Sequence, residues 1–163
     1  KSGYEFDGWS TDGVNVINVS TIPVNSTTTY HAVFTKLHNV SFVYEDVFKS
    51  NQVIRNGQYA NNVTIENTEY KVFNGWKVNG TIVNVNDYKI VNDTTFVADI
   101  TYKHDVIYKV DGETYNTQIV ATNNYPSVPA NPLKDGYEFD GWSIDGTTLV
   151  NTATIAITGN TNH

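Results

Sequence analysis

Apolar and polar residues alternate with a period of two along several short stretches of the chain. The clearest cases are residues 40–44 and 106–110, in which every second residue is Val, Phe or Tyr. Because successive side chains of a β-strand point to opposite faces, this alternation predicts strands that are half buried. Residues 52–55 and 118–120 show the same character and are predicted as short second strands.

Turn-forming residues separate these strands. Asp111-Gly112 lies between two strand patterns and predicts a tight hairpin, since both central residues of a type I′ turn need positive φ. The segments 61–69 and 126–135 occupy the same place after the paired strands. Three prolines in the second segment, Pro126, Pro129 and Pro132, exclude a regular helix there. We therefore expect an irregular crossover with at most one helical turn.

The same short motif occurs three times. Residues 3–9, Gly-Tyr-Glu-Phe-Asp-Gly-Trp, recur letter for letter at 136–142, and residues 70–76 are a variant. The three tryptophans are 67 and 66 residues apart, and other aromatic landmarks keep a step of 66. Self-similarity at a fixed period of this size predicts a tandem repeat.

The repeat has two halves, and the chain begins in the middle of one. An opening half runs from the strand at 40 or 106 to the segment before the tryptophan motif. A second half runs from that motif to an aromatic strand at 30 or 96. We predict a partial repeat (second half) at 1–36, a complete repeat at 37–103, and a repeat lacking its closing strand at 104–163.

The tryptophan motif is predicted to be a bent strand. Phe6 and Trp9 are three residues apart, so an ideal strand places them on opposite faces, and a bulge at Asp7-Gly8 returns both rings to one side. Hairpin turns at 12–13, 79–80 and 145–146 then lead into further strands. The tryptophan is interpreted as the core anchor of each repeat, because it buries a large area. The predicted structural-motif residues are Tyr4, Phe6, Gly8, Trp9, Phe73, Gly75, Trp76, Tyr137, Phe139, Gly141 and Trp142.

Composition supports a β-rich chain and excludes several functions. There are 21 Val and 21 Thr but only 3 Leu, which favours strands over helices. The net charge of -7 argues against a nucleic-acid binder, which needs a basic surface. No apolar run is long enough for a membrane span. Lys1 in the place of an initiator Met indicates a fragment or a processed chain.

Candidate chemistry is weak throughout. The chain has no Cys, and its four histidines, His31, His38, His104 and His163, lack zinc-ligand spacing. His38 and His104 are equivalent junction residues and are expected in solvated loops. Asp7, Asp12, Asp87, Asp93, Asp140 and Asp145 lie near turns and are interpreted as turn caps rather than a calcium loop. No nucleophile elbow or phosphate loop occurs. We predict no catalytic, cofactor or metal residues.

These motifs resemble the Listeria–Bacteroides repeat, also called the internalin B-repeat family. The resemblance rests on Pro132 to Trp142, which follow the pattern Pro … Lys-x-Gly-Tyr-x-Phe-x-Gly-Trp, and on the closing strand 29–34. It implies mostly β structure in tandem β-grasp-like units of about 66 residues, with little helix, and an extracellular setting on a bacterial cell surface or in a secreted protein. An all-β hairpin stalk is the alternative. The repeat 37–103 departs from the pattern, with Tyr70 in place of the glycine and Asn74 in place of the aspartate.

Three functional hypotheses follow. The first is a non-enzymatic stalk, spacer or adhesion module that binds a host or cell-envelope protein or glycan. The second is a carbohydrate-binding module, in which Tyr59, Tyr88, Tyr102 and Tyr125 stack on sugar rings; these tyrosines are equally suited to cross-strand packing. The third, a hydrolase, is disfavoured because no acid pair or nucleophile–base spacing recurs.

The incomplete ends leave two arrangements open. In one, chains associate head to tail and the 1–36 segment of a neighbour completes the sheet of 104–163, since an open sheet edge is a template for pairing. In the other, each tryptophan motif packs on the opening half that follows it, which gives closed units at 1–66 and 67–133.

Overall fold

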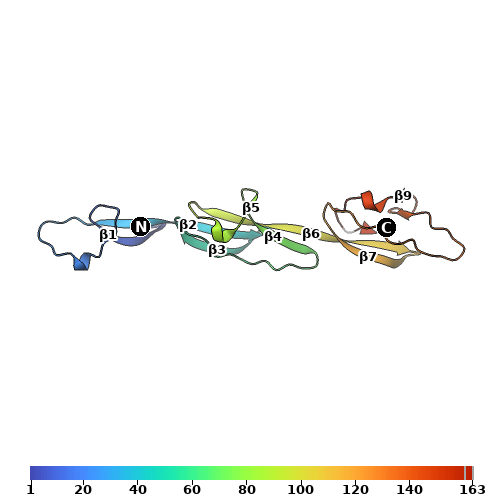
Figure 1. Cartoon of the computed structure of the whole chain (residues 1–163), viewed down its shortest axis with the longest axis horizontal. Coiled ribbons are helices and arrows are strands. Elements are labelled where there is room, and N and C mark those ends of the chain that lie inside the picture. Colours follow the sequence, from blue (N-terminus) through green and yellow to red (C-terminus); the bar gives the residue numbers. More distant parts are fainter. Residues whose placement is uncertain (160, 163) are drawn as a thin grey trace. The chain divides into compact units, whose positions relative to one another are not determined.

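The chain folds into short antiparallel hairpins and two long strands. A computed structural model describes residues 1–159 and 161–162; His163 lies outside the described residues. The chain divides into two compact units, residues 1–64 with 75–99, and residues 65–74 with 100–163 (Figure 1). The strands are β1 Tyr4–Ser10, β2 His31–Tyr44, β3 Val47–Arg55, β4 Lys71–Val78, β5 Thr81–Val83, β6 Thr94–Val110, β7 Glu113–Ala121, β8 Trp142–Ser143, β9 Leu149–Val150 and β10 Thr161–Asn162.

The prediction of a mostly β chain with little helix is confirmed. The helical elements of the described residues are single 3₁₀ turns, η1 Val19–Thr21, η2 Val85–Asp87 and η3 Thr152–Thr154. In each, an asparagine caps the turn by accepting from the backbone N–H two residues later: Asn18, Asn84 and Asn151. These caps recur at the repeat period. The β-grasp arrangement stays a prediction.

The first unit is built around β2. The beginning of β2 pairs antiparallel with β1, from His31 to Lys36, and its remainder pairs antiparallel with β3, from Leu37 to Tyr44. On its other edge, Val40–Val43 pair in parallel with the start of β6 at 94–97. β4 lies next to β6, and β5 returns antiparallel along β4.

The second unit repeats this arrangement around the end of β6. Residues 103–110 pair antiparallel with β7, and β10 pairs in parallel, Thr161 opposite Val106. This matches the pairing of Thr94 opposite Val40 in the first unit. The third tryptophan motif forms a strand only at β8, so the prediction of a bent strand through 137–142 is wrong for that copy. β1 is longer because it lies against 31–36.

Hairpin turns follow the sequence in two places and differ in a third. Asp111-Gly112, between β6 and β7, and Asn79-Gly80, between β4 and β5, both have two positive φ angles, as predicted. Asp12-Gly13 does not lead into a strand: the Asp12 carboxylate instead accepts from two backbone N–H groups of the loop. Only an isolated bridge joins Trp9 to Ile17 there.

The crossovers after β3 and β7 contain no regular element within 61–68 and 126–134, in agreement with the sequence. In both crossovers, a glutamine side chain bonds to the backbone N–H and carbonyl of one residue, as a neighbouring strand would. Gln52 donates to the carbonyl of Asn61 and accepts from its N–H, both at 2.8 Å. Gln118 does the same with Ser127 at 2.8 and 2.9 Å. Each amide therefore fixes the start of an otherwise irregular segment.

Each unit has its own apolar core. In the first unit Val40, Phe42, Trp76, Val85, Ile90 and Phe96 are buried. In the second unit Val106, Tyr108, Val120, Trp142 and Ile157 form the core. In both cores the opening strand packs on the tryptophan that follows it in sequence, Phe42 on Trp76 and Tyr108 on Trp142. This packing follows the order of an opening half and then its tryptophan motif; the boundaries of the repeats stay a prediction.

Candidate functional site

The tryptophan motif has a bulge in β1, and its glycine has a similar φ angle in all three copies. Along β1 the pairing passes from Phe6 opposite Phe34 to Gly8 opposite Val33, so Asp7 is the extra residue of a bulge. The rings of Phe6 and Trp9 consequently meet edge to face, 5.6 Å apart, and Phe139 and Trp142 do so at 5.2 Å. The predicted bulge is confirmed.

The glycine of the motif is required by its backbone and by its neighbour. Gly8, Gly75 and Gly141 have φ angles of 146°, 141° and 149°, a region that other residues rarely adopt. A Cβ on Gly8 would lie 2.5 Å from Val16, and one on Gly75 would lie 3.0 Å from Ile82. The returning chain therefore places an aliphatic side chain directly over each glycine.

The three tryptophans differ in burial. Trp76 and Trp142 are 2% and 6% exposed, whereas Trp9 is 44% exposed. Phe42 meets Trp76 at 4.9 Å between ring centroids, and the indole Nε1 donates to the Val63 carbonyl at 2.8 Å. Tyr108 meets Trp142 at 4.8 Å. The tryptophan becomes a core residue where an opening strand covers it.

Successive repeats meet within a continuous strand, which we call a junction. At the first junction Leu37 donates to the carbonyl of Gly3, and Asn56 donates to that of Lys36, both at 2.9 Å. β2 therefore changes partner from β1 to β3 between Lys36 and Leu37 without an intervening loop.

The second junction, within the second unit, has the same hydrogen bonds one period later. Lys103 donates to the carbonyl of Tyr70 at 2.8 Å, and Thr122 donates to that of Tyr102 at 2.9 Å. β7 begins its pairing with β6 at Lys103, opposite Ala121. The junction is thus a recurring structural element of the chain.

The histidines at these junctions are not in solvated loops, so that expectation is wrong. His38 is 1% exposed and shares a hydrogen bond of 3.0 Å with the Asn56 side chain. His104 is half-buried and shares one of 2.9 Å with Thr122. Both lie within a long strand directly after the change of partner, where each side chain bonds to the residue that follows β3 or β7.

Charged side chains close the first junction. Arg55, the last residue of β3, pairs with Glu5 at 2.9 Å and with Asp7 at 2.5 Å, and Thr35 donates to Asp7 at 2.6 Å. The hydrogen bond to Glu5 contributes most to raising the pKa of the Arg55 guanidinium, which the charge of Asp7 raises further. The bulge residue Asp7 is thereby tied to the strand of the following repeat.

The second junction makes its contacts without an arginine. Asn74, at the position of Asp7, donates to Thr101 at 2.8 Å, and Ala121 stands where the first junction has Arg55. Tyr70 donates to Asp105 at 3.1 Å, and this hydrogen bond raises the pKa of the Tyr70 hydroxyl. The two departures noted in the sequence, Tyr70 and Asn74, are therefore both junction residues.

The remaining candidate residues do not form a reactive site. Within residues 1–159 and 161–162, no group of three His, Cys, Asp or Glu side chains is close enough to hold a metal. Asp12 and Asp145 hold turn backbone, and Asp93 accepts from the Asn39 N–H at 2.9 Å. Tyr59 and Tyr125, one period apart, are 46% and 59% exposed, whereas Tyr88 packs on Phe96.

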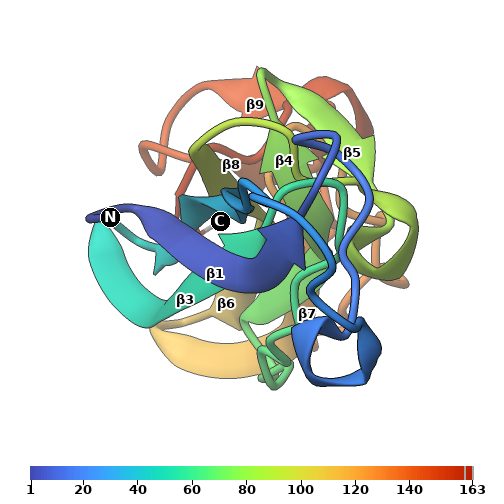
Figure 2. The same cartoon turned by 90° about the vertical axis from the view of Figure 1, so that its left-hand side faces the viewer.

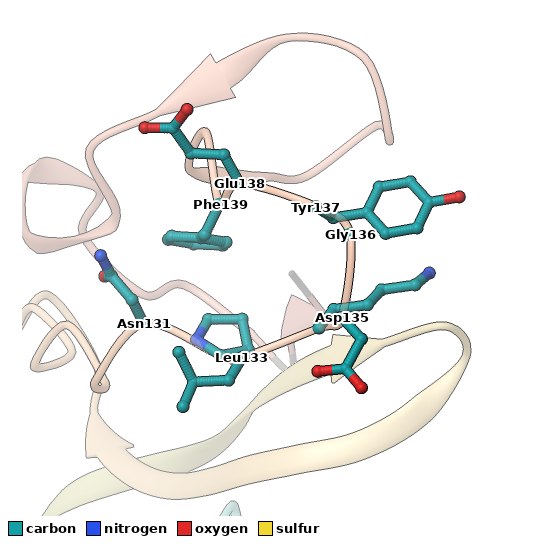
Figure 3. A pocket seen from close by; sticks show the side chains of 9 residues that line it. Asn131, Leu133, Asp135, Gly136, Tyr137, Glu138 and Phe139 are labelled. Atoms are coloured by element: carbon teal, nitrogen blue, oxygen red, sulfur yellow. The ribbon is translucent and has the colours of Figure 1, made fainter.

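A surface pocket of about 540 Å³ is lined by residues 131–139 of the second unit. Figure 3 shows Phe139 on one side of the pocket and Tyr137 on its rim, while Leu133 is 98% exposed. Lys134, whose ammonium lies 4.6 Å from the centre of the Tyr137 ring, bonds to Asp111 at 2.8 Å. The pocket is formed by one contiguous segment and brings no acid–base pair to a nucleophile.

Several of these residues were missed in the sequence although a signal existed. The glutamines that bond to the crossovers, the asparagines that cap the 3₁₀ turns and the residues that bond to His38 and His104 all recur at a step of 66 or 67 residues. Polar residues conserved between repeats of one chain mark contacts that each repeat needs. The spacing alone could have identified them, but not which backbone groups they bind.

Comparison with known families identifies two segments. Residues 104–162 match the Listeria-Bacteroides repeat domain, and residues 1–38 match the divergent InlB B-repeat domain. These matches confirm the resemblance seen in the sequence. Neither the curated proteins nor the solved structures gave a significant match. In the described part of the chain, no helix has the length and apolar character to cross a membrane.

Proposed function

We propose that this chain is a non-enzymatic spacer module of a bacterial cell-surface or secreted protein. The matches of residues 104–162 to the Listeria-Bacteroides repeat domain and of residues 1–38 to the divergent InlB B-repeat domain support this proposal. The junctions are the observation that supports this role. A spacer must hold its repeats in register, and a strand shared by two repeats does this without a linker.

The energetic argument is clearest at the first junction, which lies inside one unit. Bending β2 between Lys36 and Leu37 would break two backbone hydrogen bonds and separate Arg55 from Asp7. Each backbone bond contributes about 0.5–1.5 kcal/mol, and the exposed Arg55–Glu5 ion pair adds less. Hinge motion at the first junction is therefore resisted by the backbone hydrogen bonds and by the ion pairs of Arg55, which include the bulge residue Asp7.

Label-to-label distances test this role. The chain has no Cys, so Thr11→Cys with Lys49→Cys gives two spin labels at exposed positions on either side of the first junction. We expect one narrow distance distribution. A Gly-Gly-Ser insertion between Leu37 and His38 serves as the control and should broaden it. A broad distribution in the chain without the insertion would contradict the spacer role.

A carbohydrate-binding role is the second candidate. In that case the chain would mediate adhesion by binding a glycan. It is favoured by the repetition of one exposed tyrosine, Tyr59 and Tyr125, at equivalent positions. Exposed aromatic rings offer flat apolar faces to sugar rings. Glycan-array binding that disappears in Tyr59→Ala with Tyr125→Ala, but survives Tyr88→Ala, would support it. No binding by the original chain would exclude it for the glycans tested.

A further inference from the structure

The half-repeat at 1–36 exposes residues that the next repeat buries. A pocket of about 180 Å³ is lined by Trp9, Val19 and Tyr30. Their counterparts one period later are Trp76, Val85 and Phe96, which are 2%, 3% and 0% exposed. In Figure 2, which faces this end of the first unit, β1 and the loop that carries η1 lie foremost, with no other part of that unit drawn over them.

The complete repeats show what covers this face. In the first unit the ring of Phe42 stacks on Phe96 at 4.8 Å and meets Trp76 at 4.9 Å. In the second unit Tyr108 plays the same part on Trp142. In both cases the covering side chain comes from an opening strand that is followed by a hairpin.

The backbone gives a second, independent indication. In β6 the residues Thr94–Phe96 are strand because they pair in parallel with Val40–Phe42. Their counterparts Thr28–Tyr30 are not strand, and β2 begins only at His31. The closing strand of the half-repeat is therefore shorter at the three positions where an opening strand would pair with it. An unpaired strand edge accepts an added strand.

We propose that residues 1–36 are a docking surface for an opening half-repeat, a strand–turn–strand segment of the type seen at 37–56. Its first strand would pair in parallel with residues 28–31, and its aromatic side chain would fill the pocket between Trp9 and Tyr30. The apolar lining and the open edge together specify this occupant. The proposal does not depend on the spacer role, which concerns the strand that follows.

The test uses the full chain with a second copy of residues 37–67 fused before Lys1, which preserves the spacing from opening strand to tryptophan motif. Each tryptophan is replaced by 5-fluorotryptophan, and the Trp9 fluorine resonance is assigned with Trp9→Phe. We expect its solvent accessibility to fall to that of the Trp76 resonance. The amides of residues 29–31 should become protected from hydrogen exchange.

The matched control carries Phe42→Asp in the added copy alone, which keeps the length but cannot fill the pocket. There Trp9 should stay as accessible as in the original chain. Loss of Trp9 accessibility in the control as well, or its persistence in both fusions, would overturn the proposal.

Discussion

Residues 1–36 and residues 70–103 contain the same half of the repeat, yet only the second half-repeat has a core. Both have the motif glycine at a φ angle near 140°, and both place an aliphatic side chain over it. Trp9 nevertheless remains 44% exposed, whereas Trp76 is 2% exposed. The motif thus sets the backbone locally, but burial of its tryptophan requires an opening strand.

The largest expected effect comes from removing each tryptophan in turn. Trp76→Ala should lower the free energy of unfolding by about 3–5 kcal/mol, since it removes a buried aromatic side chain and leaves a cavity. Trp9→Ala should cost less than about 1 kcal/mol, because its ring is already half in water. Urea unfolding followed by circular dichroism measures both. Equal losses would refute the difference in burial as the explanation.

Substitution of the motif glycines should also destabilise the two regions to different extents, with a smaller difference than for the tryptophans. Gly75→Ala forces a side chain into a φ region that costs about 1–3 kcal/mol, and its Cβ would press on Ile82 at 3.0 Å. Gly8→Ala has a closer contact, 2.5 Å to Val16. Val16 and Ile82 are about equally exposed, 49% and 50%, so the exposure of the contacted side chain does not separate the two sites. The half-repeat around Gly8 has no buried tryptophan, since Trp9 is 44% exposed, and we therefore expect a smaller loss from Gly8→Ala. Thermal unfolding of the two variants compares them, and a larger loss at Gly8 would show that contact distance decides.

In the hairpins that open the two repeats, one substitution is expected to increase stability rather than decrease it. Between β2 and β3, Glu45 and Asp46 have φ angles of 49° and 61°, and between β6 and β7 Asp111 and Gly112 have 52° and 84°. Asp46→Gly should stabilise the first hairpin by about 0.5–1 kcal/mol, because glycine adopts positive φ without steric cost. Gly112→Asp should destabilise the second by a similar amount. Chemical denaturation tests both signs; a loss on Asp46→Gly would contradict the turn assignment.

The smallest expected effect is a loss of stability at low pH, through Asp12 and Asp145. Hydrogen bonds, first of all from the Ser10 hydroxyl, hold the pKa of Asp12 well below its usual value of 3.8, and the backbone N–H of Thr148 does the same for Asp145. A lowered folded-state pKa contributes stability that is present above 3.8 and lost as the pH falls through the folded-state value. Both groups are exposed, so solvent screens the effect.

The middle copy serves as the internal control for this acid effect, because its turn carries Asn79 in place of the aspartate. Amide chemical shifts of Val14 and Thr147 should change only below pH 3.8, while those of Gly80 should show no such titration. A midpoint at or above 3.8 for Val14 or Thr147 would show that these hydrogen bonds do not form in solution.

The fold could be predicted as far as local rules reach. Alternation located the strands, Asp111-Gly112 located a type I′ turn, and the spacing of Phe6 and Trp9 required a bulge. The junctions could not be predicted in this way. A strand that changes partner at Lys36 has the same alternation as one that does not, so His38 resembled a loop residue. Its burial depends on Asn56, which only the three-dimensional pairing brings beside it.

The burial of each tryptophan also lay beyond the sequence pattern, since the motif around Trp9 is identical in letters to the one around Trp142. What differs is the opening strand, which lies about 35 residues earlier in the sequence and is brought near only by the parallel pairing. The interpretation of the tryptophan as a core anchor therefore depends on a distant segment in each copy.

Hydrogen exchange at the junction amides tests the central claim, that one strand carries two successive repeats without a hinge. The donors are Leu37 and Asn56 at the first junction and Lys103 and Thr122 at the second. We predict that these four amides exchange as slowly as those of the strand residues on either side. Exchange as fast as in the irregular crossover at 61–68 would show that the repeats are joined by hinges and would contradict the spacer role.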